Sequence, residues 1–95
     1  MYSLKYTSRF EHDVNACKKK GLDLEILWQL VDVLVETGSV PPECNPHMLS
    51  EEYAGCWECH IDNDWLLVWR QNDKHLTLLL TNTGTHKELF GSDEE

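Results

Sequence analysis

Residues 57–82 read WECHIDNDWLLVWRQNDKHLTLLLTN, and this stretch decides the predicted fold class. Three runs within it are rich in aromatic residues, β-branched residues and leucine, as strands often are: 57–61, 65–70 and 75–82. Polar turns separate the runs, with Asp62-Asn63-Asp64 after the first and Gln71-Asn72-Asp73 after the second. Short turns of this kind favour antiparallel pairing, so we expect a three-stranded meander.

Two helices are predicted ahead of the meander. We expect the first over 8–20, capped by Ser8, because Phe10, Val14 and Cys17 recur at the spacing of one helical face. The second is expected over 23–37.

The second helix has both of its end signals in the sequence. Asp23 is a good N-cap, and Gly38 suits the left-handed residue that ends many helices. The apolar residues between them form one stripe: Leu24, Leu27, Trp28, Leu30, Val31, Leu34 and Val35. This stripe predicts a helix that packs on a sheet.

The remaining segments are short. Residues 2–6 alternate like a strand, residues 38–52 contain helix-breaking prolines and predict a loop, and residues 83–86 predict a bend. The order of strand, two helices and antiparallel meander predicts an α+β fold, with the helices packed on one side of the sheet. We expect a single domain over 1–91 and an acidic tail over 92–95.

Composition limits the class of protein. The chain has 95 residues, of which 41% are hydrophobic, which suits one small core. No stretch approaches the roughly 20 apolar residues of a membrane helix, and the first residues lack the apolar run of a signal peptide. We therefore expect a cytoplasmic protein with no membrane contact and with reduced thiols at its four cysteines: Cys17, Cys44, Cys56 and Cys59.

Charge is unevenly distributed along the chain. The net charge is −9, and residues 21–66 contain ten acids and no Lys or Arg. Such an acidic chain argues against tight binding of free nucleic acid, which depends on Lys and Arg. The acidic segment is interpreted either as a solvated face or as a docking surface for a basic partner.

Three histidines lie near predicted turns or strand ends: His47, His60 and His86. Asp64 follows His60 across the first turn of the meander, and the bend over 83–86 can return to the same end of the sheet. Imidazole titrates near neutral pH, so imidazoles and a carboxylate in one cleft suit general acid–base chemistry. A single histidine is more often structural than catalytic. The acid–base hypothesis therefore requires that these side chains converge in the folded protein.

Two patterns resemble one bacterial protein family. Residues 60–65 contain His-x-x-x-Asp-Trp, and residues 83–90 contain Thr-Gly-Thr-His-x-x-Leu-Phe. Together they resemble the YafQ toxins, which belong to the RelE/ParE superfamily of toxin–antitoxin systems. The resemblance covers nearly the whole chain, because the preceding strand and helices also fit, and it implies a RelE-like fold.

The resemblance implies an mRNA interferase, a ribosome-associated endoribonuclease that needs no metal ion or organic cofactor. A ribose 2′-OH would attack its own 3′ phosphate, which requires a base, a group that stabilises phosphoryl charge, and an acid for the 5′ oxygen. His86 is the expected acid. The base is expected among Asp64, His47 and His60, and a protonated histidine among them would stabilise the charge.

Four further residues are expected to contact the substrate: Trp65, Phe90, Arg70 and Lys87. Phe90 would stack on a base or pack behind His86. Trp65 suits the core equally well, and Arg70 and Lys87 belong to the few cations of the second half of the chain.

The resemblance also implies partners. A cognate antitoxin of the DinJ/RelB kind would hold the toxin inactive through an extended or helical segment. Such antitoxins commonly dimerise through a DNA-binding domain, so we expect a heterotetramer that contacts operator DNA only through the antitoxin. The toxin alone is expected to be a monomer that acts on the ribosome and its mRNA.

Two features depart from the family pattern. Many members have a basic residue shortly before the motif histidine, where this chain has Trp57 and Glu58, and such toxins are usually basic. These departures favour an alternative: a catalytically weak or inactive toxin fold that binds an antitoxin or another protein.

The same residues allow other classes of site. Residues 56–60 match C-x-x-C-H, a haem-attachment pattern, with Met48 as a second ligand, or a thioredoxin-like pair. A strand there would point Cys56 and Cys59 to opposite faces, which opposes both. A zinc shell is a further alternative, although its spacing matches no standard finger; its members would be His47, His60, His86 and Asp64, with Cys44 nearby.

Overall fold

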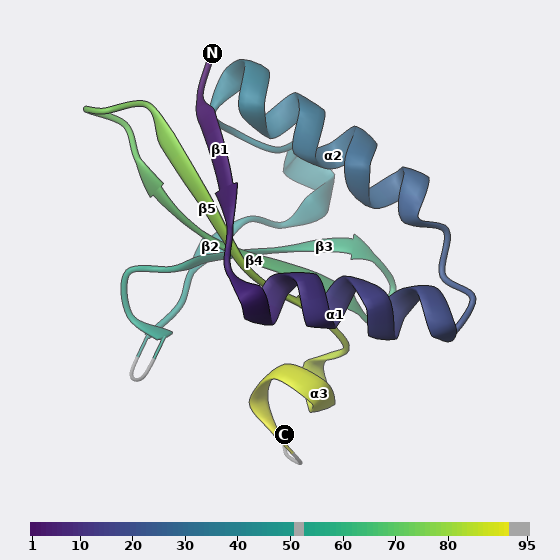
Figure 1. Ribbon diagram of the computed structural model, residues 1–95. Helices are drawn as coiled ribbons and strands as arrows, with labels where there is room; N and C mark the ends of the chain where they lie inside the picture. The colour runs from purple at the N-terminus through teal and green to yellow at the C-terminus, as the bar shows by residue number, and fades with distance from the viewer. Residues whose placement is uncertain (51–52, 92–95) are drawn as a thin grey trace.

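The computed structural model describes residues 1–50 and 53–91, so the predicted tail over 92–95 lies outside the described residues. A five-stranded sheet with the order β1-β5-β4-β3-β2 is combined with two long helices and a short third one (Figure 1). The predicted α+β class is confirmed. Within the described ranges, no helix is long and apolar enough to cross a membrane.

The predicted meander forms the centre of the sheet. It consists of β3 (Trp57–Asp62), β4 (Trp65–Asn72) and β5 (Thr77–Gly84), paired antiparallel. β1 (Ser3–Tyr6) pairs parallel with β5 at one edge, and β2 (His47–Met48) pairs antiparallel with β3 at the other. Placing residues 47–48 in a loop was wrong, because backbone groups along the edge of β3 pair with this two-residue strand.

The first helix begins with a different cap from the expected one. α1 (Ser8–Lys19) is capped by Thr7, whose backbone is extended and whose Oγ1 accepts the N–H of Phe10 at 3.0 Å. Ser8 is already helical and cannot serve as the cap.

The second helix has both predicted caps. α2 (Leu24–Thr37) starts after Asp23, whose carboxylate accepts a backbone N–H, and ends at Gly38 in the left-handed conformation. A Cβ on Gly38 would lie 2.6 Å from the ring of Tyr2, so the close approach also requires glycine. A short 3₁₀ helix, η1 (Pro42–Cys44), follows in the connection to β2.

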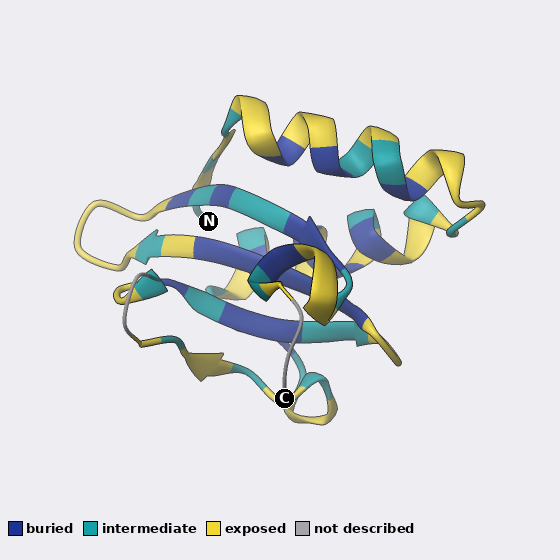
Figure 2. Ribbon diagram, turned by 90° about the horizontal axis from the view of Figure 1, so that it is seen from below, coloured by how far each residue is buried: buried dark blue, intermediate teal, exposed yellow. Residues whose placement is uncertain are grey.

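α1 and α2 cover one face of the sheet, as predicted (Figure 1). The main core lies between them and the strands, and its buried members are Phe10, Cys17, Leu27, Leu30, Val31, Leu34, Val40, Cys59, Trp65, Leu67, Trp69, Leu78 and Leu80. Figure 2 shows the corresponding pattern, with buried residues along the strands and on one side of each helix. Burying a large apolar side chain contributes about 1.5–3 kcal/mol, so this core fixes both helices on the sheet.

A smaller core lies on the opposite face, formed by Cys56, Leu66, Val68 and Leu89. α3 (His86–Phe90) packs here, and the predicted bend over 83–86 is therefore wrong. β5 continues to Gly84, and Thr85 then caps α3 in a capping box: Thr85 Oγ1 accepts the N–H of Glu88 at 3.1 Å, and the carboxylate of Glu88 accepts the N–H of Thr85 at 2.8 Å.

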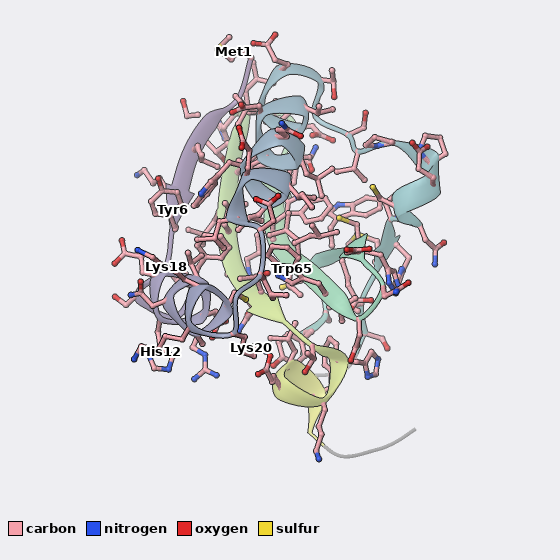
Figure 3. All side chains as sticks on the ribbon, turned by 90° about the vertical axis from the view of Figure 1, so that its right-hand side faces the viewer. Met1, Tyr6, His12, Lys18, Lys20 and Trp65 are labelled. Carbon is pink, nitrogen blue, oxygen red and sulfur yellow. The ribbon has the colours of Figure 1, made fainter. Side chains whose placement is uncertain are left out.

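Polar contacts tie α1 to this C-terminal segment. Asp13 is buried, and its Oδ2 accepts the backbone N–H of Thr83 at 3.2 Å. Lys20 lies at the end of α1, where Figure 3 labels it, and its Nζ donates to Glu88 Oε2 at 2.7 Å. These contacts fix the position of the turn that leads into His86.

Candidate active site

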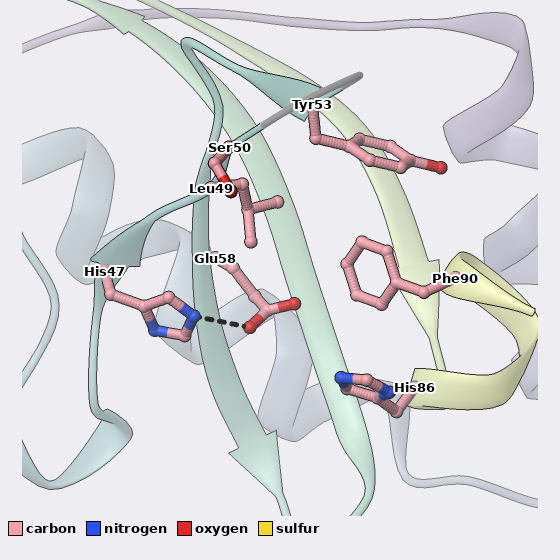
Figure 4. A pocket seen from close by; sticks show the side chains of 7 residues that line it. All are labelled: His47, Leu49, Ser50, Tyr53, Glu58, His86 and Phe90. Carbon is pink, nitrogen blue, oxygen red and sulfur yellow. Dashed lines mark ion pairs between the residues drawn. The ribbon is translucent and has the colours of Figure 1, made fainter. Parts of the chain in front are cut away.

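One open pocket of about 380 Å³ lies on the face of the sheet that carries α3. Its walls come from β2, β3, the segment between them, and α3 (Figure 4). The lining residues are His47, Leu49, Ser50, Tyr53, Glu58, His86 and Phe90. The pocket therefore contains two of the three predicted histidines, and it combines titratable side chains with aromatic ones.

His47 and Glu58 form an ion pair in one wall. They are paired residues of neighbouring antiparallel strands, so their side chains project from the same face. His47 Nε2 lies 2.9 Å from Glu58 Oε1, and Nδ1 lies 3.1 Å from the carbonyl oxygen of Asn45. The side chain of His47 is 45% exposed and that of Glu58 only 5%, so the carboxylate is buried behind a solvent-facing imidazole.

His86 stands across the pocket as the first residue of α3. Its backbone N–H donates to Asp64 Oδ1 at 3.1 Å, which connects the start of α3 to the turn between β3 and β4. Its ring lies 4.9 Å from that of Phe90, and Phe90 in turn packs edge-on against Tyr53 at 5.1 Å. The Tyr53 hydroxyl donates to the carbonyl oxygen of Leu89 at 3.0 Å. This hydrogen bond anchors Tyr53 to α3, and Phe90 is held between the rings of Tyr53 and His86.

His60 and Asp64 lie close to the pocket but are not among its lining residues. His60 is two residues beyond Glu58 on β3, and its Nδ1 lies 3.3 Å from the carbonyl oxygen of Asn63. Its ring lines a neighbouring shallow hollow together with Asn45 and Asp62.

The other predicted substrate contacts lie in three different places. Trp65 is buried in the main core, where its Nε1 donates to Thr83 Oγ1 at 2.9 Å (Figure 3). Arg70 lines a separate hollow with Gly55 and Lys5. Lys87 is exposed on α3, beside His86. Of the four residues, only Phe90 lines the pocket itself.

Sequence reasoning missed Glu58 and Tyr53 as pocket residues. Glu58 was noted only as a departure from the family pattern, although its spacing of two from His60 places both on one face of a strand. Tyr53 lay in a segment that carried no periodic signal.

The cysteine geometry excludes two alternatives. Cys59 belongs to the main core and Cys56 to the smaller core, so the two thiols point to opposite faces of the sheet. Burial raises the pKa of Cys59 to about 12. One haem cannot bond to both thiols, and a dithiol pair cannot form, so the haem and thioredoxin-like interpretations are wrong.

The zinc interpretation finds no support in this geometry. Within residues 1–50 and 53–91, no group of three or more His, Cys, Asp or Glu side chains is placed to hold a metal ion.

Comparisons with known proteins agree with this fold. A family model described as "Bacterial toxin of type II toxin-antitoxin system, YafQ" matches residues 2–91. The "mRNA interferase toxin YafQ" of Escherichia coli (strain B / BL21-DE3) is 32% identical over 89 residues, which make up 93% of this chain and 95% of that protein.

Two solved structures are similar over nearly the full length. The crystal structure of YafQ from E. coli strain BL21(DE3) has a TM-score of 0.87 at 28% identity, covering 96% of this chain and 100% of that chain. A chain of the crystal structure of the E. coli DinJ-YafQ complex has a TM-score of 0.86 at 28% identity, with the same coverage of 96% and 100%.

Proposed function

The chain belongs to the YafQ family of toxins from bacterial type II toxin–antitoxin systems, and from this premise we propose that it cleaves mRNA on the ribosome. The observation that carries the proposal is the pocket in which His86 faces the His47–Glu58 pair (Figure 4). A similar protein of E. coli is named an mRNA interferase toxin, which supports the same activity here.

The proposed reaction is a transesterification within the RNA. The ribose 2′-OH attacks the adjacent 3′ phosphate, and the 5′ oxygen of the next nucleotide leaves. His86 is proposed to protonate that leaving oxygen, because it lines the pocket from α3 and is exposed. His47, across the pocket and paired with a carboxylate, is proposed to stabilise charge on the phosphoryl oxygens.

Asp64 and His60 are proposed to support the site from its edge. Asp64 accepts the backbone N–H of His86 and so positions the start of α3. His60 occupies the hollow next to the pocket, where a neighbouring nucleotide of a bound strand would lie.

Recognition of the RNA is proposed to rest on stacking and on the ribosome rather than on charge. Phe90 offers a ring to a base beside His86, and Lys87 and Arg70 supply cations outside the pocket. The net charge of −9 makes tight binding of free RNA unfavourable, so the ribosome must position the substrate. Ribosome dependence would place the activity in the cytoplasm.

A cognate antitoxin is the proposed regulator. An E. coli YafQ has been crystallised with DinJ, and we propose that an antitoxin of that kind binds this chain, gives a heterotetramer, and alone contacts operator DNA. The toxin without its antitoxin is proposed to be a monomer.

A binding module without activity is the second candidate. It is favoured by the acidic charge and by Trp57 and Glu58, which stand where many family members have a basic residue. The two candidates differ in whether the folded wild-type protein cleaves RNA, and the nuclease further requires that this cleavage depend on His86.

The test is cleavage of mRNA on purified, programmed ribosomes, mapped by primer extension. We expect cleavage that requires ribosomes and is lost in His86→Ala. His75→Ala is the matched control, since His75 is exposed in the turn between β4 and β5, away from the pocket. Cleavage that is unchanged in His86→Ala would contradict the assignment, and a folded wild-type protein without cleavage would favour the binding module.

A further inference from the structure

We propose that a second pocket, between β1, α1 and α2, binds an arginine side chain of the antitoxin. We call it the aromatic pocket, and its lining residues are Tyr6, Phe10, Glu11, Val14, Asn15 and Trp28. This inference rests on the proposed toxin function, because it says how the regulator of that function would hold the chain.

The aromatic pocket lies on the face of the sheet that the two long helices cover. Tyr6 ends β1, Phe10 lies in the first turn of α1, and Trp28 lies near the start of α2. Phe10 belongs to the main core and Trp28 packs against it, whereas α3 and the smaller core lie on the opposite face. A side chain bound in the aromatic pocket would therefore leave the pocket of His86 open.

Three aromatic rings meet in the aromatic pocket. The ring of Tyr6 stacks on that of Phe10 with centroids 5.7 Å apart, and the ring of Trp28 is steeply inclined to that of Phe10 at 6.3 Å. Phe10 is buried, but Tyr6 is 47% exposed and Trp28 is half-buried, so both can contact a partner (Figure 3 labels Tyr6). Cations bind over the faces of such rings, most strongly over Trp, and the guanidinium of Arg does so most often.

Carboxylates surround these rings. Glu11 lines the aromatic pocket, is exposed, and forms no ion pair within the described ranges. On α2, Glu25 and Asp32 stand one turn before and one turn after Trp28, and both are exposed. α2 itself contains no Lys, Arg or His. Rings and carboxylates therefore favour the same ligand, a side chain with a long apolar stem and a cationic end.

Charge complementarity selects the occupant. The three carboxylates would repel an RNA phosphate, and they would equally repel the acidic residues 92–95 of the chain itself. A basic segment of the antitoxin can pair with the carboxylates and place one cation over the rings. The volume of the aromatic pocket, about 320 Å³, suits one such side chain rather than a helix. The acidic segment over 21–66, interpreted from sequence as a possible docking surface, thereby gains an anchor point.

The test uses a short alanine-based peptide that has arginine at every fourth position. Matched peptides have citrulline, which has the shape of arginine without its charge, or leucine at the same positions. NMR follows the indole N–H of Trp28 and the backbone N–H of Glu11 in the labelled protein. We expect the arginine peptide to shift both signals and the citrulline peptide to bind at least about threefold more weakly, because the cation–π contact and the ion pair are lost.

Changes in the aromatic pocket separate the rings from the charge. Trp28→Leu should weaken binding of the arginine peptide about 2–30-fold. Glu11→Gln should weaken it about 2–5-fold, and this loss should disappear at high salt. Because Trp28 packs on the main core, Tyr6→Leu is a second ring variant at an exposed position, and urea unfolding checks that each variant is folded. Glu43→Gln, an exposed change in η1, is the matched control and should bind like the wild type.

Other results would overturn the proposal. Equal binding of the arginine and citrulline peptides, or no binding of the arginine peptide, would show that the aromatic pocket does not recognise a cation. Tighter binding of the leucine peptide would assign it to an apolar partner. Sedimentation of the chain as a dimer that is lost in Tyr6→Leu would assign it to a second copy of the chain.

Cleavage of mRNA on ribosomes separates the antitoxin from the ribosome as the partner. Trp28→Leu and Glu11→Gln should cleave like the wild type, because the aromatic pocket lies on the face opposite the pocket of His86. Slower cleavage by these folded variants would indicate that the aromatic pocket contacts the ribosome and would overturn the antitoxin assignment. Absence of cleavage by the wild type would instead contradict the proposed nuclease, and the peptide titration, which needs no activity, would still test the aromatic pocket.

Discussion

Replacing Asp13 by alanine should destabilise the protein through one buried contact that holds the segment before His86. The Asp13 carboxylate accepts the backbone N–H of Thr83 at 3.2 Å and the side-chain amide of Asn82 at 3.4 Å. Its other oxygen pairs with Arg9 at 3.0 Å. Asp13 itself is only 6% exposed, so water cannot replace these contacts without a rearrangement of α1.

The magnitude follows from these contacts. A buried N–H left without its acceptor, here that of Thr83, costs about 1–3 kcal/mol. The ion pair adds only about 0–1 kcal/mol, because the Arg9 side chain is 61% exposed. We therefore expect Asp13→Ala to lower the free energy of unfolding by about 1–4 kcal/mol, out of a total of roughly 5–15 kcal/mol for a domain of this kind.

Urea unfolding followed by tryptophan fluorescence measures this difference. Arg9→Ala is the control and should lose less than about 1 kcal/mol, since it removes only the exposed partner. Asp13→Asn should fall between the two because its amide oxygen can still accept from Thr83. If Asp13→Ala unfolds at the same urea concentration as Arg9→Ala, the contact to Thr83 does not carry the stability assigned to it.

Two further predictions concern titratable groups. The hydrogen bond from Lys20, with a smaller contribution from the backbone N–H of Thr85, lowers the pKa of Glu88. The Glu88 carboxylate therefore stabilises the fold at pH values above its unfolded pKa. This stabilisation is lost as the pH falls through the pKa of Glu88 in the folded protein. Acid unfolding of Lys20→Gln should therefore begin at higher pH than that of the wild type, and identical curves would contradict the role of the pair. Burial raises the pKa of Cys59 to about 12, so at neutral pH a thiol reagent should label the partly exposed Cys44 of the native protein before Cys59. Mass spectrometry of the labelled peptides measures the order of labelling. Early labelling of Cys59 would refute its burial.

The helices and the meander could be predicted because their signals are local. Asp23, Gly38 and the apolar stripe between them lie within one segment, and they define α2 without reference to the rest of the chain. The capping box of Thr85 and Glu88 is equally local, yet the short α3 that it starts was taken for a bend, since five residues carry no helical periodicity.

The sheet edges could not be predicted in this way. β1 pairs with β5 across more than 70 positions of sequence, with Ser3 opposite Thr77, and the two-residue β2 has no pattern of its own. Both strands exist because the meander offers unpaired edges to them. Their register is therefore a property of the folded chain.

The candidate site was predictable in its histidines but not in its carboxylate. His47 and His86 were expected to converge and both line the pocket, whereas His60 and Asp64 lie beside it. The importance of Glu58 depends on its burial and on the pairing of β2 with β3, which placed His47 against it. Neither property has a signature in sequence.

We propose that this pocket catalyses attack by a ribose 2′-OH, and the chemical structure of the cleavage products is the decisive test of this mechanism. Ribosomes programmed with mRNA that has a single 2′-deoxynucleotide on the 5′ side of the cleavage site provide the substrate. We expect the natural mRNA to give a 2′,3′-cyclic phosphate and a 5′-hydroxyl end, and we expect no cleavage of the deoxy-substituted mRNA at that position. Cleavage of the deoxy-substituted mRNA at that position, or products with a 5′ phosphate, would contradict it.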